Sequence, residues 1–274
     1  ASGLVMFYWL KEFLSERAAF SGALLYLFGP YHLINLHFRV AIGELLGMVF
    51  LPLSLWMMLR WLRYASVVNL FLVSVSICGL VLSHQALALI GVPVVILYGL
   101  VLVMPLSWKK VGTVLLPLVI GMGMSGYYWI PVILESTYTH QAAYVARVSF
   151  KPLWWYLVAP WRVGLLHQGH YGELAPSVGY VQWLVVLSAM SMVVRRKFER
   201  RLRRIGILII LLFWGYFFML TRLSETMWEL IPILRNMQFS YRMMGVVLLT
   251  SSVLGALVIE KINNAIARLS KLKK

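Results

Sequence analysis

Histidine, glutamate and arginine are the residues of this chain that could perform chemistry, because aspartate is absent and Cys78 is the only cysteine. A metal site built on several thiolates is therefore excluded. The histidines fall in or beside gaps between apolar runs, all on one side of a membrane by the charge pattern described below. This distribution suggests a site there, although histidine also tolerates interfaces and could simply occupy loops. The histidines are His32, His37, His84, His140, His167 and His170.

Five glutamates lie on the same side, and Glu44 is the most informative because it lies about one helical turn inside an apolar run. An ionisable group within a membrane span is costly unless it is paired or wetted. We therefore expect Glu44 to be buried with a partner, Arg39 or a histidine, and both a structural ion pair and a functional site fit this position. Glu135 follows a proline at a helix end, where substrate contact and a solvated loop position are both open. The other three are Glu173, Glu225 and Glu229.

Arginines on this side suggest a ligand class. Arg235 and Arg242 flank Gln238 just before the last apolar run. Guanidinium groups are planar, permanently charged and bidentate, so they suit a lipid-linked phosphate at a membrane surface. The alternative is that these arginines extend toward lipid headgroups without a specific role.

His167 and His170 have a spacing found among metal ligands, but Gln168 and Gly169 between them indicate a turn, and no third ligand is evident. The sequence therefore predicts no cofactor, and a divalent metal is left open.

The elements that must position these residues are membrane helices. The chain is 61% hydrophobic and only 12% charged, against about a quarter charged in soluble domains. Apolar runs near the length of a span recur without alternating strands, so the sequence predicts an all-α, polytopic transmembrane helical bundle. We expect this bundle to have about nine spans, the first one incomplete, in a single domain that is N-terminally truncated. The runs are 2–10, 18–28, 40–59, 67–83, 86–104, 111–131, 178–194, 205–220 and 243–259.

The net charge of +16 would point to nucleic acid in a soluble protein, but here its distribution reflects topology. Eighteen of the 25 basic residues fall in every second gap between the runs. The positive-inside rule makes those gaps cytoplasmic, including a basic loop at 195–204 and the C-terminus. The alternate gaps, including a long aromatic loop at 132–177, are then on the outer face of the cell inner membrane. Membrane lipids, rather than nucleic acid, are the expected surroundings.

Four short motifs resemble bacterial membrane proteins of the 6-pyruvoyl-tetrahydropterin-synthase-related family. They are the block 22–44 with Arg39 and Glu44, the turn Leu82-Ser83-His84-Gln85, the helix end from Tyr127 to Glu135, and Gln238-Phe239-Ser240-Tyr241-Arg242. The last block lacks a proline and a tryptophan found in the family pattern. That family is similar to the GT-C glycosyltransferases, so the resemblance implies a GT-C-like fold and a polyprenyl-phosphate sugar as substrate.

The resulting hypothesis is a GT-C-like glycosyltransferase, or the C-terminal part of one, that acts on the outer face. Arg242 and Arg235 would hold the phosphate, His84 and Glu44 would line the cavity, and a loop upstream of Ala1 would supply the base. The alternative is a non-catalytic integral-membrane subunit that packs against other membrane subunits. A transporter is a third candidate, disfavoured by the lack of clear internal repeats.

Overall fold

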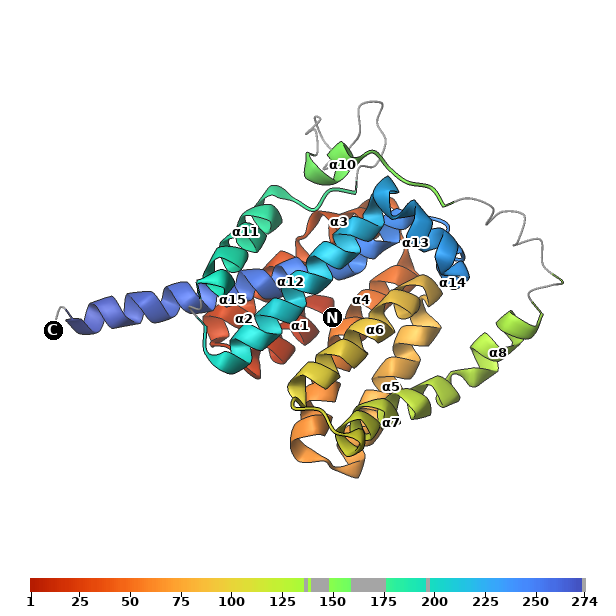
Figure 1. The fold of residues 1–274 in the computed structure, drawn as a ribbon, viewed down its shortest axis with the longest axis horizontal. Coiled ribbons are helices and arrows are strands. Elements are labelled where there is room, and N and C mark those ends of the chain that lie inside the picture. The colour runs from red at the N-terminus through yellow and green to blue at the C-terminus, as the bar shows by residue number, and fades with distance from the viewer. Residues whose placement is uncertain (136–137, 139–147, 159–175, 196–197, 273–274) are drawn as a thin grey trace.

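A computed structural model describes residues 1–135, 138, 148–158, 176–195 and 198–272, and within these ranges the chain folds as helices. Figure 1 shows them gathered into one bundle, from which α8 and the C-terminal end of α15 project. The described residues also contain one isolated parallel β-bridge, between Ser149 and Phe239. The helices are α1 (Ser2–Lys11), α2 (Glu16–Leu27), α3 (Pro30–Leu33), the π-helix η1 (Ile34–Phe38), α4 (Ile42–Tyr64), α5 (Val67–Ser83), α6 (Gln85–Leu102), α7 (Trp108–Met124), α8 (Gly126–Leu134), α10 (Leu153–Leu157), α11 (Tyr180–Val194), α12 (Arg200–Leu220), η3 (Arg222–Ser224), α13 (Glu225–Leu230), α14 (Pro232–Arg235), η4 (Ser240–Met243) and α15 (Met244–Leu272).

Several of these helices fit a membrane protein by length and composition. Within the described residues, four helical segments are long and apolar enough to cross a bilayer, or up to five if the bent pair α7 and α8 is one span. The apolar helices α5 and α11 are shorter, with 17 and 15 residues. The four segments are Ile42–Tyr64, Gln85–Leu102, Arg200–Leu220 and Ser240–Ser270.

The segment that contains α15 is the most deeply buried of the four membrane-length segments. All residues of 243–258 are buried, and α2, α11 and α12 pack around this stretch (Figure 1). Three hydroxyl groups lie in it, and each donates to a carbonyl one turn earlier in the same helix, Thr250 to Val246, and Ser251 and Ser252 to Leu248. A helix that is apolar all round, with its hydroxyls bonded internally, can be buried at its whole circumference.

Small residues let α2 approach α15. A Cβ atom added at Gly22 would come 2.8 Å from the Ala256 Cβ and 2.5 Å from a methyl of Leu10. A Cβ added at Gly255 would come 2.2 Å from a methyl of Leu25, on the same helix pair. Close backbone approach of this kind is typical of helix packing in membranes.

Carboxylates anchor both ends of α4. Near its C-terminal end, Glu12 accepts hydrogen bonds from Arg63 at 2.6 Å and from the Trp56 indole at 3.0 Å, and Arg60 lies at ion-pair distance. We call this the basic end of the bundle. Glu44 lies in the first turn of α4, and we call the opposite end, where it lies, the site end.

Three segments differ from their sequence-based description. The run 111–131 is bent by 71° between α7 and α8, at Ser125, whose hydroxyl donates to the Gly121 carbonyl and competes with the helical hydrogen bonds. The basic stretch predicted as a loop over 195–204 is helical from Arg200, and the last helix continues beyond residue 259 to Leu272. Of the predicted loop 132–177, the described part includes the end of α8 and α10.

The close contact of α2 with α15 can be tested by Gly22→Ala. We expect this change to lower the free energy of unfolding by about 1–2 kcal/mol, because overpacking outweighs the gain in helix propensity. The control is Gly215→Ala in α12, where no heavy atom lies within 4 Å of the added Cβ; it should leave stability unchanged or raise it by up to about 1 kcal/mol. Unfolding in mixed detergent micelles measures both, and equal values for the two variants would contradict the packing argument.

Candidate functional site

The Glu44 carboxylate at the site end is buried, and Arg39 is its partner. Glu44 Oε2 accepts a hydrogen bond from Arg39 Nη1 at 2.8 Å, and the Glu44 side chain is 2% exposed. Arg39 directly follows η1, five residues before Glu44, so the break between η1 and α4 brings the two charges together. The predicted burial of Glu44 with Arg39 as partner is confirmed.

Tyr31 and Asn35 complete this ion pair and were missed by the sequence analysis. The Tyr31 hydroxyl donates to Glu44 Oε1, and Asn35 Oδ1 accepts from Arg39 Nη1 at 2.5 Å. Burial, and then the Glu44 carboxylate, raise the pKa of Tyr31, so its hydroxyl stays protonated and remains a donor. The signal in the sequence is that Tyr31, Asn35 and Arg39 follow each other at intervals of four, which places them on one face of a helical turn.

His84 lies at the junction of α5 and α6 and caps α6. Its Nδ1 accepts a hydrogen bond from the backbone N–H of Leu87 at 3.1 Å, so in the neutral ring the proton is on Nε2. Burial is the largest influence and lowers the pKa of His84; Arg242 and Arg39 lower it further, and Glu44 opposes them. His84 is therefore a neutral imidazole at pH 7 that presents Nε2–H.

Arg242 lies in η4, immediately before α15. Its Nη1 donates to the Met237 carbonyl at 2.8 Å, and its guanidinium carbon lies 5.6 Å from the centre of the Phe239 ring. Its Nε is buried and has no hydrogen-bond partner among the described residues. Among the described residues, no carboxylate forms an ion pair with Arg242.

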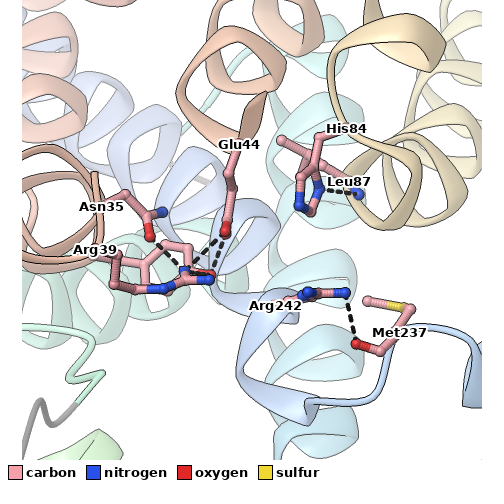
Figure 2. Close-up of polar contacts among 8 residues, drawn as sticks. Asn35, Arg39, Glu44, His84, Leu87, Met237 and Arg242 are labelled. Atoms are coloured by element: carbon pink, nitrogen blue, oxygen red, sulfur yellow. Dashed lines mark hydrogen bonds and ion pairs between the residues drawn. The ribbon is translucent and has the colours of Figure 1, made fainter. Parts of the chain in front are cut away.

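These groups converge from three separate parts of the chain. In Figure 2 the Glu44 and His84 side chains point toward the region in which the Arg39 and Arg242 side chains lie. The charges of Glu44, Arg39 and Arg242 all act on His84, which is consistent with this proximity. With one carboxylate, two guanidinium groups and a neutral imidazole, the group has a net charge of +1 and can take up an anion.

The remaining candidates are Arg235, Gln238 and Glu135. Arg235 is exposed in α14, where its Nη2 donates to the Glu229 carbonyl at 3.3 Å. Gln238 has a left-handed backbone with φ of 64°, and its carbonyl accepts the N–H of Ser149 at 2.9 Å. Glu135 is exposed at the end of α8. Within the part of the chain that the structure describes, no hydrogen bond or ion pair joins these three to Glu44 or Arg242.

The other predicted histidine positions divide between described and undescribed residues. His32 is buried, within 3.5 Å of the Ser2 hydroxyl, and burial lowers its pKa to about 4. His37 is exposed. No group of three His, Cys, Asp or Glu side chains that could hold a metal occurs among the described residues. His140, the pair His167 and His170, and Glu173 lie outside them.

Comparisons with protein families, with curated proteins and with solved structures give no match for this chain. By its fold and its site geometry, the described part of this chain is a helical protein with several apolar helices of membrane length and a buried polar group at one end.

The ion pair can be tested by Glu44→Gln. We expect a loss of about 2–4 kcal/mol in unfolding free energy, because the change leaves a half-buried guanidinium without its counter-ion. Arg222 and Glu225 form an exposed pair, 83% and 50% exposed, so Glu225→Gln is a matched control and should change stability by less than about 0.5 kcal/mol. Unfolding in mixed micelles compares the two variants, and similar losses would refute the proposed importance of the buried pair.

The protonation state of His84 gives a second prediction. Because Arg242 lowers and Glu44 raises the pKa of His84, Arg242→Gln should raise this pKa and Glu44→Gln should lower it further. Nitrogen chemical shifts of selectively labelled histidine, recorded between pH 4 and 8 in micelles with His84→Gln for assignment, would measure both. Shifts of the same sign in the two variants would show that the charges do not share one site.

Proposed function

We propose that this chain is a multi-pass membrane protein that binds the phosphate of a polyprenyl-phosphate sugar at the site end, and that the complete protein transfers the sugar to an acceptor. The observation that carries the proposal is Arg242, a guanidinium with a buried, unpartnered Nε that lies beside a neutral histidine and an ion pair that is already satisfied. The proposal includes about nine spans and a GT-C-like arrangement of helices.

The charge of the site favours a phosphate ligand. Arg39 donates to Glu44 and Asn35, whereas the side-chain hydrogen bond that Arg242 makes within the described ranges is to a neutral carbonyl. A phosphate oxygen would satisfy the remaining donors of Arg242 and could also accept from His84 Nε2–H. As the bond from sugar to phosphate breaks, negative charge on the phosphate grows, and fixed donors stabilise that charge.

Glu44 has a positioning role in this proposal. Its two oxygens accept hydrogen bonds from Tyr31 and Arg39, so its carboxylate is occupied and is poorly suited to take a proton from an acceptor. It instead fixes Arg39 and offsets its charge, which leaves Arg242 as the excess cation. Among the described residues, no catalytic base is assigned.

The proposed orientation places the site end on the outer face of the cell inner membrane. Arg60 and Arg63 belong to the basic end, and so does Arg201, whose charge acts on Tyr98 together with those of Arg63 and Glu12. The positive-inside rule assigns such an end to the cytoplasm. The C-terminus then lies in the cytoplasm, since α15 runs from Arg242 at the site end toward Glu260, which accepts from Ser15 near the basic end. The polyprenyl chain would lie in the outer leaflet.

A second function, that of a non-catalytic membrane subunit, is favoured by α8. This helix turns away from α7 by 71° and projects from the bundle (Figure 1). Tyr127 and Leu134 on it are 73% and 71% exposed. Such a projecting apolar helix suits contact with another membrane subunit as well as with lipid.

The phosphate site is tested by ligand binding to the full-length protein in micelles, with polyprenyl phosphate as the probe and the uncharged polyprenol as its comparison. Wild type should bind the phosphate more tightly than the alcohol. Arg242→Gln should weaken phosphate binding about tenfold or more, and Arg242→Lys should recover it only in part, because bidentate geometry is lost.

The matched control is Arg222→Gln, since Arg222 is an exposed arginine of the neighbouring η3 segment, and it should bind as wild type does. Equal affinity of wild type and Arg242→Gln would remove Arg242 from the site. Phosphate binding without any sugar transfer by the full-length protein would favour the subunit over the enzyme.

A further inference from the structure

A second basic site lies at the opposite end of the bundle. Between the last turn of α6 and the first turns of α12 the surface is hollowed, with Val101, Leu102 and Ile205 as apolar lining and Arg200, Arg201 and Arg204 as basic lining. In Figure 1 the corresponding ends of α6 and α12 lie near each other at the lower edge of the bundle. This hollow shares no residue with the group around Glu44 and Arg242.

The three arginines are arranged unfavourably in the absence of an anion. Arg200 and Arg204 are spaced i, i+4 on one helix, where like charges repel. They also occupy the first turns of α12, where the helix dipole disfavours positive charge, and among the described residues no side chain caps that end.

Some basic residues at this end of the bundle have carboxylate partners, but within the described ranges these three do not. Arg60 and Arg63 share Glu12, and Lys11 pairs with Glu16. Arg200, Arg201 and Arg204 are exposed, and within the described ranges none of them forms an ion pair. An anion in the hollow would offset both the mutual repulsion and the dipole.

The surroundings of the hollow indicate that this anion belongs to a lipid. The segment that follows α6 exposes apolar side chains, with Met104 at 44%, Leu106 at 51% and Trp108 at 92%. Exposed tryptophan and apolar residues beside basic groups are typical of the boundary between hydrocarbon and headgroups. A free phosphate would leave the apolar lining uncovered, whereas a lipid can place acyl chain there and its phosphate against the arginines.

We propose that the hollow between α6 and α12 is a specific site for the phosphate headgroup of an anionic membrane lipid. The phosphate is bound by the three arginines, Arg200, Arg201 and Arg204. The part of the acyl chains nearest the headgroup contacts Val101, Leu102 and Ile205. Basic hollows between membrane helices recognise anionic headgroups in this way. The lipid would join α6 to α12 at the basic end, independently of any ligand at the site end.

The test is native mass spectrometry of the full-length protein released from nanodiscs that contain phosphatidylglycerol and phosphatidylcholine. Wild type should retain phosphatidylglycerol in preference to phosphatidylcholine. The triple variant Arg200→Gln, Arg201→Gln, Arg204→Gln should reduce the retained phosphatidylglycerol about tenfold or more, because three charge-assisted contacts are lost.

The control variant removes the same charge elsewhere, with Lys109→Gln, Lys110→Gln and Arg268→Gln, all exposed residues outside the hollow. It should retain phosphatidylglycerol as wild type does. Equal loss in both triple variants would overturn the proposal in favour of nonspecific attraction. Displacement of phosphatidylglycerol by millimolar inorganic phosphate or glycerol phosphate would also overturn it, since the site would then recognise a soluble anion.

The single variant Arg204→Gln distinguishes loss of the lipid site from a folding defect in the triple variant. It should lower retention severalfold, while the thermal unfolding of lipid-free protein in neutral detergent stays like that of wild type. Unchanged retention in this variant together with loss only in an unfolded triple variant would refute the site.

Discussion

The Arg39–Glu44 ion pair fixes how the chain enters its first long apolar helix. A carboxylate at the start of α4 would be costly in an apolar bundle without a counter-ion, and a guanidinium after η1 has the same difficulty. Their contact, extended by Tyr31 and Asn35, sets the path between α3 and α4. Glu12 does the same at the other end of α4, where it joins Arg60 and Arg63 to the segment after α1. The helix is thus held at both ends by polar contacts, and its middle packs through apolar side chains.

The site end depends on this arrangement because its groups come from segments far apart in the chain. Tyr241, just before Arg242, lies under the Arg39 guanidinium, 5.1 Å from ring centre to guanidinium carbon. Arg39 therefore contacts both the start of α4 and the entry to α15. Since α15 is buried along 243–258, its entry position is set by the packing of the whole bundle. The location of Arg242 relative to His84 is consequently a property of the fold and not of a loop.

Much of this could be predicted from the sequence. The burial and pairing of Glu44 followed from the cost of a charge inside an apolar run, with Arg39 only five residues away. The position of Arg242 before the last helix followed from the apolar run that begins at residue 243. Tyr31 and Asn35 were not predicted, because a tyrosine and an asparagine carry no charge that demands a partner. Arg235 is exposed and donates to the Glu229 carbonyl, and Gln238 has a left-handed backbone; neither feature was predicted from the charge or apolar pattern. The turn at Gln238 adjoins the pairing of Ser149 with Phe239, a long-range contact without a local sequence signal.

The proposed phosphate site around Arg242 and the proposed lipid site between α6 and α12 differ in how far their arginines are buried. This difference determines which ligands each site can select. Arg242 is partly buried, and its Nε has no hydrogen-bond partner among the described residues, so the phosphate that we propose there must match its donors in direction as well as in charge. Arg200, Arg201 and Arg204 are exposed around a hollow, where salt screens their field and water can replace any contact that is lost. The first arrangement favours recognition of one phosphate in one geometry. The second favours any anionic phospholipid whose acyl chains cover the apolar lining. In these two proposals the chain combines a selective phosphate site at one end with a lipid contact of broader specificity at the other.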